Sequence, residues 1–281
     1  MRKLSAIISL FLVSVVWGAT FPLVKGSLDF ITPLGFIALR FLLAFALLSI
    51  FFAKSLKGNK ELLFPGFVLG LFLFLGYFFQ TVGLKYTSSS HSGFITGLYV
   101  VFTPIFAVLM IKEKLSLKVI IAVFLSLIGL YLLSNMSGGM NFGDFLTLLC
   151  AISYAIQVVL VAKYSRMYNP TSLTIIELAF VFLLSTGGWA WEGFYYQMNS
   201  FMLFGVIFTG VFATALAILA QTHAQRVIPS SHAAVIYTTE PVFAGIFSYL
   251  LLGETLGTNG IIGAALILFG MLLVALDKSG S

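Results

Sequence analysis

Residues 80–115 read QTVGLKYTSSSHSGFITGLYVVFTPIFAVLMIKEKL, and residues 221–256 read QTHAQRVIPSSHAAVIYTTEPVFAGIFSYLLLGETL. The two stretches align without a gap, and several polar residues recur at matching positions. These matches are Gln80 with Gln221, Thr81 with Thr222, Ser89 with Ser230, Ser90 with Ser231, His91 with His232, and Glu113 with Glu254. Apolar composition alone does not align polar residues, so the chain contains an internal duplication.

The duplication extends beyond these two stretches. Gly129 aligns with Gly270 at the same offset, and earlier positions align at a slightly different one. Those earlier matches are Trp17 with Tyr154, Pro33 with Pro170, and Arg40 with Glu177. The sequence therefore predicts two repeats, residues 1–137 and 138–281.

The composition places the repeats in a membrane. Hydrophobic residues make up 60% of the chain and charged residues only 9%, which excludes a water-soluble fold. One bilayer crossing needs about 20 apolar residues. The apolar runs predict an all-α protein with ten spans, at residues 4–24, 32–53, 62–84, 92–111, 117–133, 142–162, 172–189, 201–221, 231–252 and 258–276.

Basic residues predict how these spans are oriented. With the N-terminus in the cytoplasm, the outside loops contain only Lys25 and Lys85, and nearly all other Lys and Arg residues lie inside. Both termini are then cytoplasmic in a cytoplasmic (inner) membrane. Five spans per repeat make the second copy inverted. The net charge of +6 is explained by anionic lipid at the inner surface and needs no nucleic-acid partner.

Two short motifs carry a resemblance to a known family. They are the Trp17-Gly18 pair in the first span and the E-x-L ending of the fourth and ninth spans, at Glu113 and Glu254. Together with the duplication and the length, they resemble the EamA-type branch of the drug/metabolite transporter superfamily. The resemblance implies that helices 1–4 and 6–9 enclose a cavity, with helices 5 and 10 at the periphery. It also implies export of amino acids, other metabolites or toxic compounds.

Charged residues inside spans indicate where function lies. Arg40, Glu177 and Glu240 occupy spans, where a charge costs about 2.5–3.5 kcal/mol on insertion scales and is expected to face protein or water. Our hypothesis is that Glu240 binds a substrate amine or a proton. The alternative is a structural hydrogen bond or an ion pair with Arg40. Polar stripes containing Tyr237 and Glu240, and Thr96 and Tyr99, are expected to face each other across the cavity.

Aromatic and amide side chains complete the predicted site. The candidate cavity residues are Trp17, Arg40, Gln80, Thr96, Tyr99, Tyr154, Gln157, Gln221, Tyr237 and Glu240. The candidates for coupling are His91, Glu177 and His232. Alternatives remain for these groups: Trp17 can serve packing, and the serines before the histidines are expected to cap helices. Pro22, Pro104 and Pro241 are expected hinges.

The function predicted from these features is secondary transport. The cargo is expected to be an amino acid or related zwitterion, exported by alternating access. The main alternative is an exporter of drug-like or aromatic and cationic compounds. An intramembrane enzyme or a passive channel is an alternative of another class, although no HExxH, GxSxG, CxxC or P-loop is present. We expect no cofactor and no metal, a proton or counter-substrate as coupling partner, contact with membrane lipid, and a monomer or homodimer.

Overall fold

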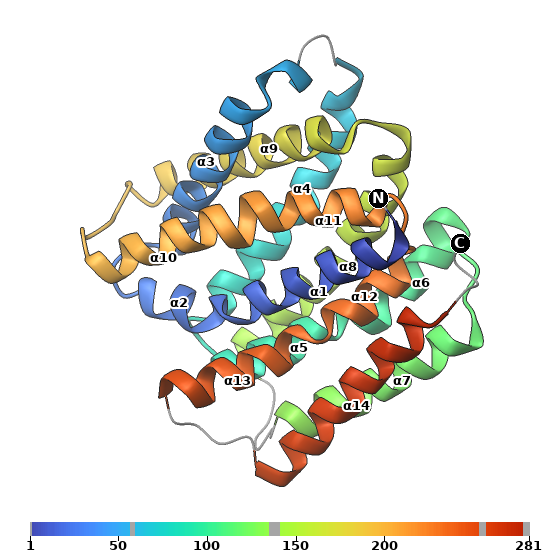
Figure 1. Ribbon diagram of the computed structural model, residues 1–281. Helices are drawn as coiled ribbons and strands as arrows, with labels where there is room; N and C mark the ends of the chain where they lie inside the picture. The colour runs from blue at the N-terminus through green and yellow to red at the C-terminus, as the bar shows by residue number, and fades with distance from the viewer. Residues whose placement is uncertain (1, 57–59, 135–140, 253–256, 278–281) are drawn as a thin grey trace.

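A computed structural model describes residues 2–56, 60–134, 141–252 and 257–277, and nearly all of them are helical (Figure 1). The α-helices are α1 (Lys3–Gly18), α2 (Thr20–Ser27), α3 (Pro33–Phe51), α4 (Leu63–Gly83), α5 (Ser89–Gly97), α6 (Tyr99–Ile111), α7 (Leu117–Ser134), α8 (Phe142–Met167), α9 (Pro170–Trp191), α10 (Ser200–Gly210), α11 (Ala217–Gln225), α12 (Ser230–Tyr237), α13 (Glu240–Leu252) and α14 (Gly257–Ala275). Short 3₁₀ turns occupy Ala53–Leu56 and Lys60–Leu62, and a π-helical turn occupies Val211–Leu216.

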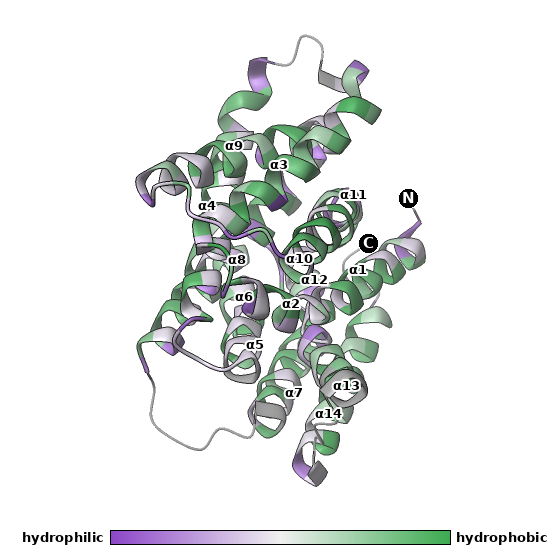
Figure 2. Cartoon of the chain, turned by 90° about the vertical axis from the view of Figure 1, so that its left-hand side faces the viewer, coloured by the Kyte–Doolittle hydropathy of each residue, from purple (hydrophilic) through white to green (hydrophobic). Residues whose placement is uncertain are grey.

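The described helices form a multi-pass membrane protein. Eight helical segments in this part of the chain are long and apolar enough to cross a bilayer, and 117–132 is a shorter apolar helix. Hydrophobic residues cover the outer faces of the helices, and hydrophilic ones gather mainly at the helix ends and loops (Figure 2). This is the distribution expected of helices surrounded by lipid. The count of ten spans and their orientation stay predictions.

Three predicted spans are interrupted near their prolines. Helix α1 ends at Gly18 and α12 ends at Tyr237. These residues lie four positions before Pro22 and Pro241, which have no backbone N–H to bond the carbonyls of Gly18 and Tyr237. The third break, at Leu98 between α5 and α6, lies a turn and a half before Pro104. Each of these spans therefore consists of two half-helices.

Helices α7 and α14 pack against each other at one edge of the molecule (Figure 1), as the resemblance implied for the fifth and tenth helices. Glycines allow their backbones to approach closely. A Cβ atom added at Gly129 would lie 2.6 Å from the carbonyl oxygen of Gly263 and 2.7 Å from the Ile267 side chain. The glycine repeated at positions 129 and 270 therefore serves helix packing.

Substitution of Gly129 by valine is expected to destabilise this pair. The added side chain must push α14 away, and overpacking of this kind costs about 1–3 kcal/mol. Thermal unfolding of the purified protein in detergent measures the effect. Gly187→Val is the matched control, because nothing lies within 4 Å of a Cβ at Gly187. Equal unfolding midpoints for the two variants would contradict the packing role.

A carboxylate links two half-helices at one end of the molecule. Glu113 follows α6, and its carboxylate accepts hydrogen bonds from the backbone N–H of Ser230 (3.1 Å), the backbone N–H of Ser231 (3.1 Å) and the hydroxyl of Ser230 (2.5 Å). Glu113 thus caps the first turn of α12, where a negative charge is favourable. The expectation that serine hydroxyls cap this helix is wrong, since the N-cap residue is Pro229, the Ser230 hydroxyl donates to Glu113, and the Ser231 hydroxyl has no partner among the described residues.

The same end joins the start and the finish of the described chain. Lys3 donates to the backbone carbonyl of Asp277 at 2.5 Å, and Ser116 donates to the Asp277 carboxylate. The Nε2 atom of His232 lies 3.4 Å from that carboxylate. His232 therefore belongs to this cluster of helix ends.

Candidate functional site

The broken helices and their neighbours surround a cavity whose empty space, open solvent included, is about 510 Å³. The cavity is lined by Trp17, Thr20, Arg40, Leu73, Tyr77, Gln80, Tyr99, Tyr154, Gln157, Val158, Gln221, Tyr237 and Glu240. Every candidate cavity residue from the sequence except Thr96 is among them. Thr96 instead accepts a hydrogen bond from the side-chain amide of Gln80 at 3.2 Å.

The lining comes from both halves of the chain. Helices α1, α2, α3, α4 and α6 contribute from the first half, and α8, α11, α12 and α13 contribute from the second. None of the described lining residues comes from α9. The resemblance implied that helices 6–9 help to enclose the cavity. This is wrong for the seventh predicted helix, α9, which packs against α3 and α4.

Arg40 is held by three hydrogen bonds. Its Nε–H donates to the Thr214 hydroxyl at 2.5 Å, and its Nη2 donates to the Tyr77 hydroxyl at 3.1 Å and to the Ala213 carbonyl at 3.2 Å. The guanidinium also lies over the Tyr77 ring, 4.5 Å from its centroid, a cation-π contact. Arg40 is only 3% exposed, and no carboxylate within the described residues pairs with it.

Glu240 is the first residue of α13, directly after the break in the ninth span. Its backbone carbonyl packs against Gly18 of α1, where a Cβ would lie 2.8 Å away. In the described part of the chain, its carboxylate makes no hydrogen bond and no ion pair, with Arg40 or with any other group. The cavity therefore contains one acidic and one basic side chain that are not bonded to each other.

Aromatic rings form much of the wall. Trp17 packs on Tyr237 with 5.3 Å between ring centroids, and its indole N–H donates to the Ala213 carbonyl at 2.8 Å. Gly76 leaves room for Tyr154, because a Cβ there would lie 2.2 Å from that ring. Tyr77, between Arg40 and Tyr154, was missed by sequence reasoning. Its position three residues before Gln80 on α4 was the available signal.

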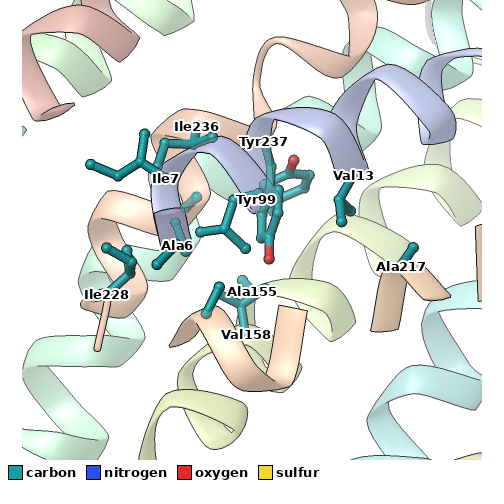
Figure 3. Packing of buried hydrophobic residues seen from close by; sticks show 14 of the residues in the cluster. Ala6, Ile7, Val13, Tyr99, Ala155, Val158, Ala217, Ile228, Ile236 and Tyr237 are labelled. Atoms are coloured by element: carbon teal, nitrogen blue, oxygen red, sulfur yellow. The ribbon is translucent and has the colours of Figure 1, made fainter. Parts of the chain in front are cut away.

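Two of the lining tyrosines meet in a buried apolar cluster (Figure 3). The rings of Tyr99 and Tyr237 have centroids 6.4 Å apart, and Val13, Ala155 and Val158 surround them. Their hydroxyl groups are buried and have no hydrogen-bond partner among the described residues. Tyr99 and Tyr237, one from each predicted polar stripe, both line the cavity, and that the two stripes face each other across it stays a prediction.

A chain of amides leads from the cavity to Glu177. Gln221 donates to the Gln157 side-chain carbonyl at 3.1 Å, and Gln157 donates to the Glu177 carboxylate at 2.8 Å. Glu177 is fully buried and does not line the cavity, and its second carboxylate oxygen has no hydrogen bond within the described part of the chain. Its repeat counterpart Arg40 does.

Two of the three coupling candidates have different hydrogen-bond and charge partners. Glu177 accepts a hydrogen bond from Gln157, and His232 lies beside Asp277 at the end of the molecule. The side chain of the third candidate, His91, is outside the described residues. The roles of all three in coupling stay predictions.

The geometry is that of a small-molecule site between two related halves of a helical membrane protein. The sequence pattern of the EamA-like transporter family matches residues 4–135 and again residues 141–276. The chain belongs to the EamA-like transporter family. As a member of that family, it is a membrane transporter, with a small-molecule substrate and a lipid environment.

Individual relatives agree with this membership. An uncharacterized transporter of Archaeoglobus fulgidus is 38% identical over 277 residues, covering 98% of this chain and 87% of the relative. The uncharacterized transporter YyaM of Bacillus subtilis is 26% identical, covering 97% and 94%. A crystal structure with 21% identity has a TM-score of 0.79 and covers 97% of this chain and 96% of the other, which shows a shared fold.

Proposed function

We propose that this EamA-family protein is a secondary transporter that exports an amino acid or related zwitterion by alternating access. The observation that carries the proposal is the separation of Arg40 and Glu240 in one cavity. Both are nearly buried, at 3% and 8% exposure, and neither has a partner of opposite charge in the described residues.

The two charges favour a ligand that compensates both. Burying an unpaired charge inside a protein costs roughly several kcal/mol of free energy, and this cost is recovered only when a counter-charge binds with good geometry. A zwitterion supplies two counter-charges at once, with its ammonium near Glu240 and its carboxylate near Arg40. The rings of Trp17, Tyr77 and Tyr154 then provide apolar surface for a side chain.

The broken helices support alternating access. In membrane transporters, discontinuous helices commonly line a central site, and related halves exchange conformations around it. We infer ten spans in two inverted five-helix repeats, residues 1–137 and 138–281, with both termini cytoplasmic. The hydrogen bond from Lys3 to the Asp277 carbonyl supports an even number of crossings, because it joins the two ends of the described chain on one side.

One observation favours a second candidate, an exporter of aromatic or cationic compounds. Three N–H groups of Arg40 are already bonded, whereas the carboxylate of Glu240 is free and aromatic rings lie in the same wall. A cation without a carboxylate would satisfy Glu240 alone. The two candidates differ in whether the transported molecule needs a carboxylate.

Counterflow in proteoliposomes tests the proposal. We expect vesicles loaded with unlabelled L-phenylalanine to accumulate external labelled L-phenylalanine in a saturable way, because an occupied carrier exchanges faster than an empty one returns. L-Phenylalanine is the first probe because the cavity wall is aromatic, and other L-amino acids follow in the same assay. Protein-free liposomes are the control.

Other outcomes separate the alternatives. Flux that stays linear with concentration would indicate a channel, and a chemically altered product would indicate an enzyme. Exchange of phenethylamine without exchange of any amino acid would favour the exporter of cations. Each of these results would overturn the proposed zwitterion transport.

A further inference from the structure

The eighth predicted span contains a backbone irregularity that its repeat counterpart lacks. The π-turn at Val211–Leu216 divides it between α10 and α11. In the aligned repeat, position 214 corresponds to Leu73, which lies in the uninterrupted α-helix α4. Short π-helical turns inside α-helices frequently occur at functional sites. The two otherwise related halves of the chain therefore differ at this turn.

The π-turn supplies hydrogen-bond partners to two cavity residues. The Ala213 carbonyl accepts from both the Trp17 indole at 2.8 Å and Nη2 of Arg40 at 3.2 Å. The Thr214 hydroxyl accepts from Nε of Arg40 at 2.5 Å and donates to the Thr209 carbonyl at 2.8 Å. The bond from Thr214 to the Thr209 carbonyl spans five residues, which is the π-helical spacing. It fixes the Thr214 hydroxyl in place, and the same hydroxyl accepts the hydrogen bond from Arg40.

These bonds determine which part of the guanidinium stays available. An arginine has five N–H groups in a rigid plane. In Arg40, Nε donates one and Nη2 donates two, to Thr214, Tyr77 and Ala213. The two N–H groups of Nη1 have no partner among the described residues. The plane is therefore held with a single nitrogen, Nη1, left for a ligand.

We propose that Thr214 is a positioning residue that makes the cavity selective for substrates with a carboxylate, acting through Arg40 rather than by touching the substrate. The Thr214 hydroxyl fixes the plane of the guanidinium, and the Ala213 carbonyl fixes its rotation. This inference rests on the proposed function, because it assigns Nη1 of Arg40 to the carboxylate of a zwitterion.

A measurement without ligand tests the positioning. The chain has four arginines, Arg2, Arg40, Arg166 and Arg226, and all except Arg40 are exposed. In NMR spectra of protein labelled with ¹⁵N-arginine, we expect one slowly exchanging Nε–H signal, which disappears in Arg40→Lys. Thr214→Val should make its exchange at least tenfold faster, because the acceptor of that N–H is gone.

Control variants separate positioning from general disruption. Thr214→Ser keeps the hydroxyl and should keep the slow signal. Thr174→Val removes an equally buried hydroxyl, which bonds Thr222 away from the cavity, and should also keep it. Thr214→Ala removes the same hydroxyl and replaces Thr214→Val if valine prevents folding. A slow Arg40 signal that is unchanged in both hydroxyl-free variants would overturn the proposal.

A pair of ligands tests the selectivity. L-Phenylalanine and phenethylamine differ only in the carboxylate. Thr214→Val should weaken binding of L-phenylalanine about tenfold, as expected for one misaligned charge-assisted hydrogen bond, and should leave phenethylamine binding within about twofold. Equal weakening of both ligands would indicate a merely structural Thr214. If the wild type binds neither ligand, the proposed function fails while the NMR result still decides the positioning.

Discussion

Glu240→Gln is expected to lower amino-acid transport by more than about 100-fold at every pH. Glutamine keeps the size of the side chain and the contact between the residue 240 backbone and Gly18, but it removes the negative charge. Breaking one partner of a buried ion pair costs about 3–5 kcal/mol. The substrate ammonium would lose its only counter-charge among the described lining residues. Initial counterflow rates across a pH series measure the loss.

Glu192→Gln is the control for Glu240→Gln. Glu192 is exposed at the end of α9, so the same chemical change there should leave transport unchanged. Size-exclusion chromatography of both variants checks that they are folded. Transport by Glu240→Gln at the wild-type rate over the whole pH series would remove Glu240 from the mechanism.

The sequence predicted the fold most directly at positions where a single residue determines the backbone geometry. Pro22 and Pro241 interrupt hydrogen bonding four residues earlier, and the helices end at Gly18 and Tyr237. The π-turn could not be predicted in this way. Neither proline nor glycine occurs within Val211–Leu216, and the turn is hydrogen-bonded to Trp17 and Arg40, which lie far away in the sequence.

The cavity was predictable from a simple constraint: a polar side chain in a lipid-facing helix must turn toward protein or water. Gln80, Gln157 and Gln221, which this constraint singled out, are among the residues that line the cavity. It does not distinguish a side chain that lines a cavity from one that makes a hydrogen bond between helices. Thr96 and Glu177 are of the second kind: each is hydrogen-bonded to a glutamine and lies outside the lining.

Glu113→Ala is expected to open the end of the molecule that contains Asp277. The substitution removes the acceptor of three hydrogen bonds at the start of α12. A hydrogen bond to a charged group contributes about 1.5–3 kcal/mol, and 1.4 kcal/mol already changes a local equilibrium about tenfold. The link between α6 and α12, the half-helices that carry Tyr99 and Tyr237, would be lost.

Alkylation of a buried cysteine measures this opening. The chain has one native cysteine, Cys150, which is buried, so Cys150→Ala gives a clean background. In that background, Ala234→Cys places a thiol in α12 at a position that is 0% exposed. Maleimide should react at least about tenfold faster when Glu113→Ala is added, since alkylation follows the population of the locally open form.

Two further variants define what the rate means. Glu113→Gln keeps one acceptor oxygen and loses the negative charge. It should give an intermediate rate, because its oxygen can take the place of Oε2, which accepts both Ser230 groups, or of Oε1, which accepts from the Ser231 N–H, and the amide nitrogen takes the other place. Lys114→Ala removes a neighbouring charge whose side chain is exposed, and it should leave the rate unchanged. Equal rates for the Glu113→Ala and Lys114→Ala proteins would mean that apolar packing around Tyr99 and Tyr237 keeps this end closed without the carboxylate. The ratio of the alkylation rates of the Glu113→Ala and Lys114→Ala proteins thus measures the contribution of the Glu113 cap to closure.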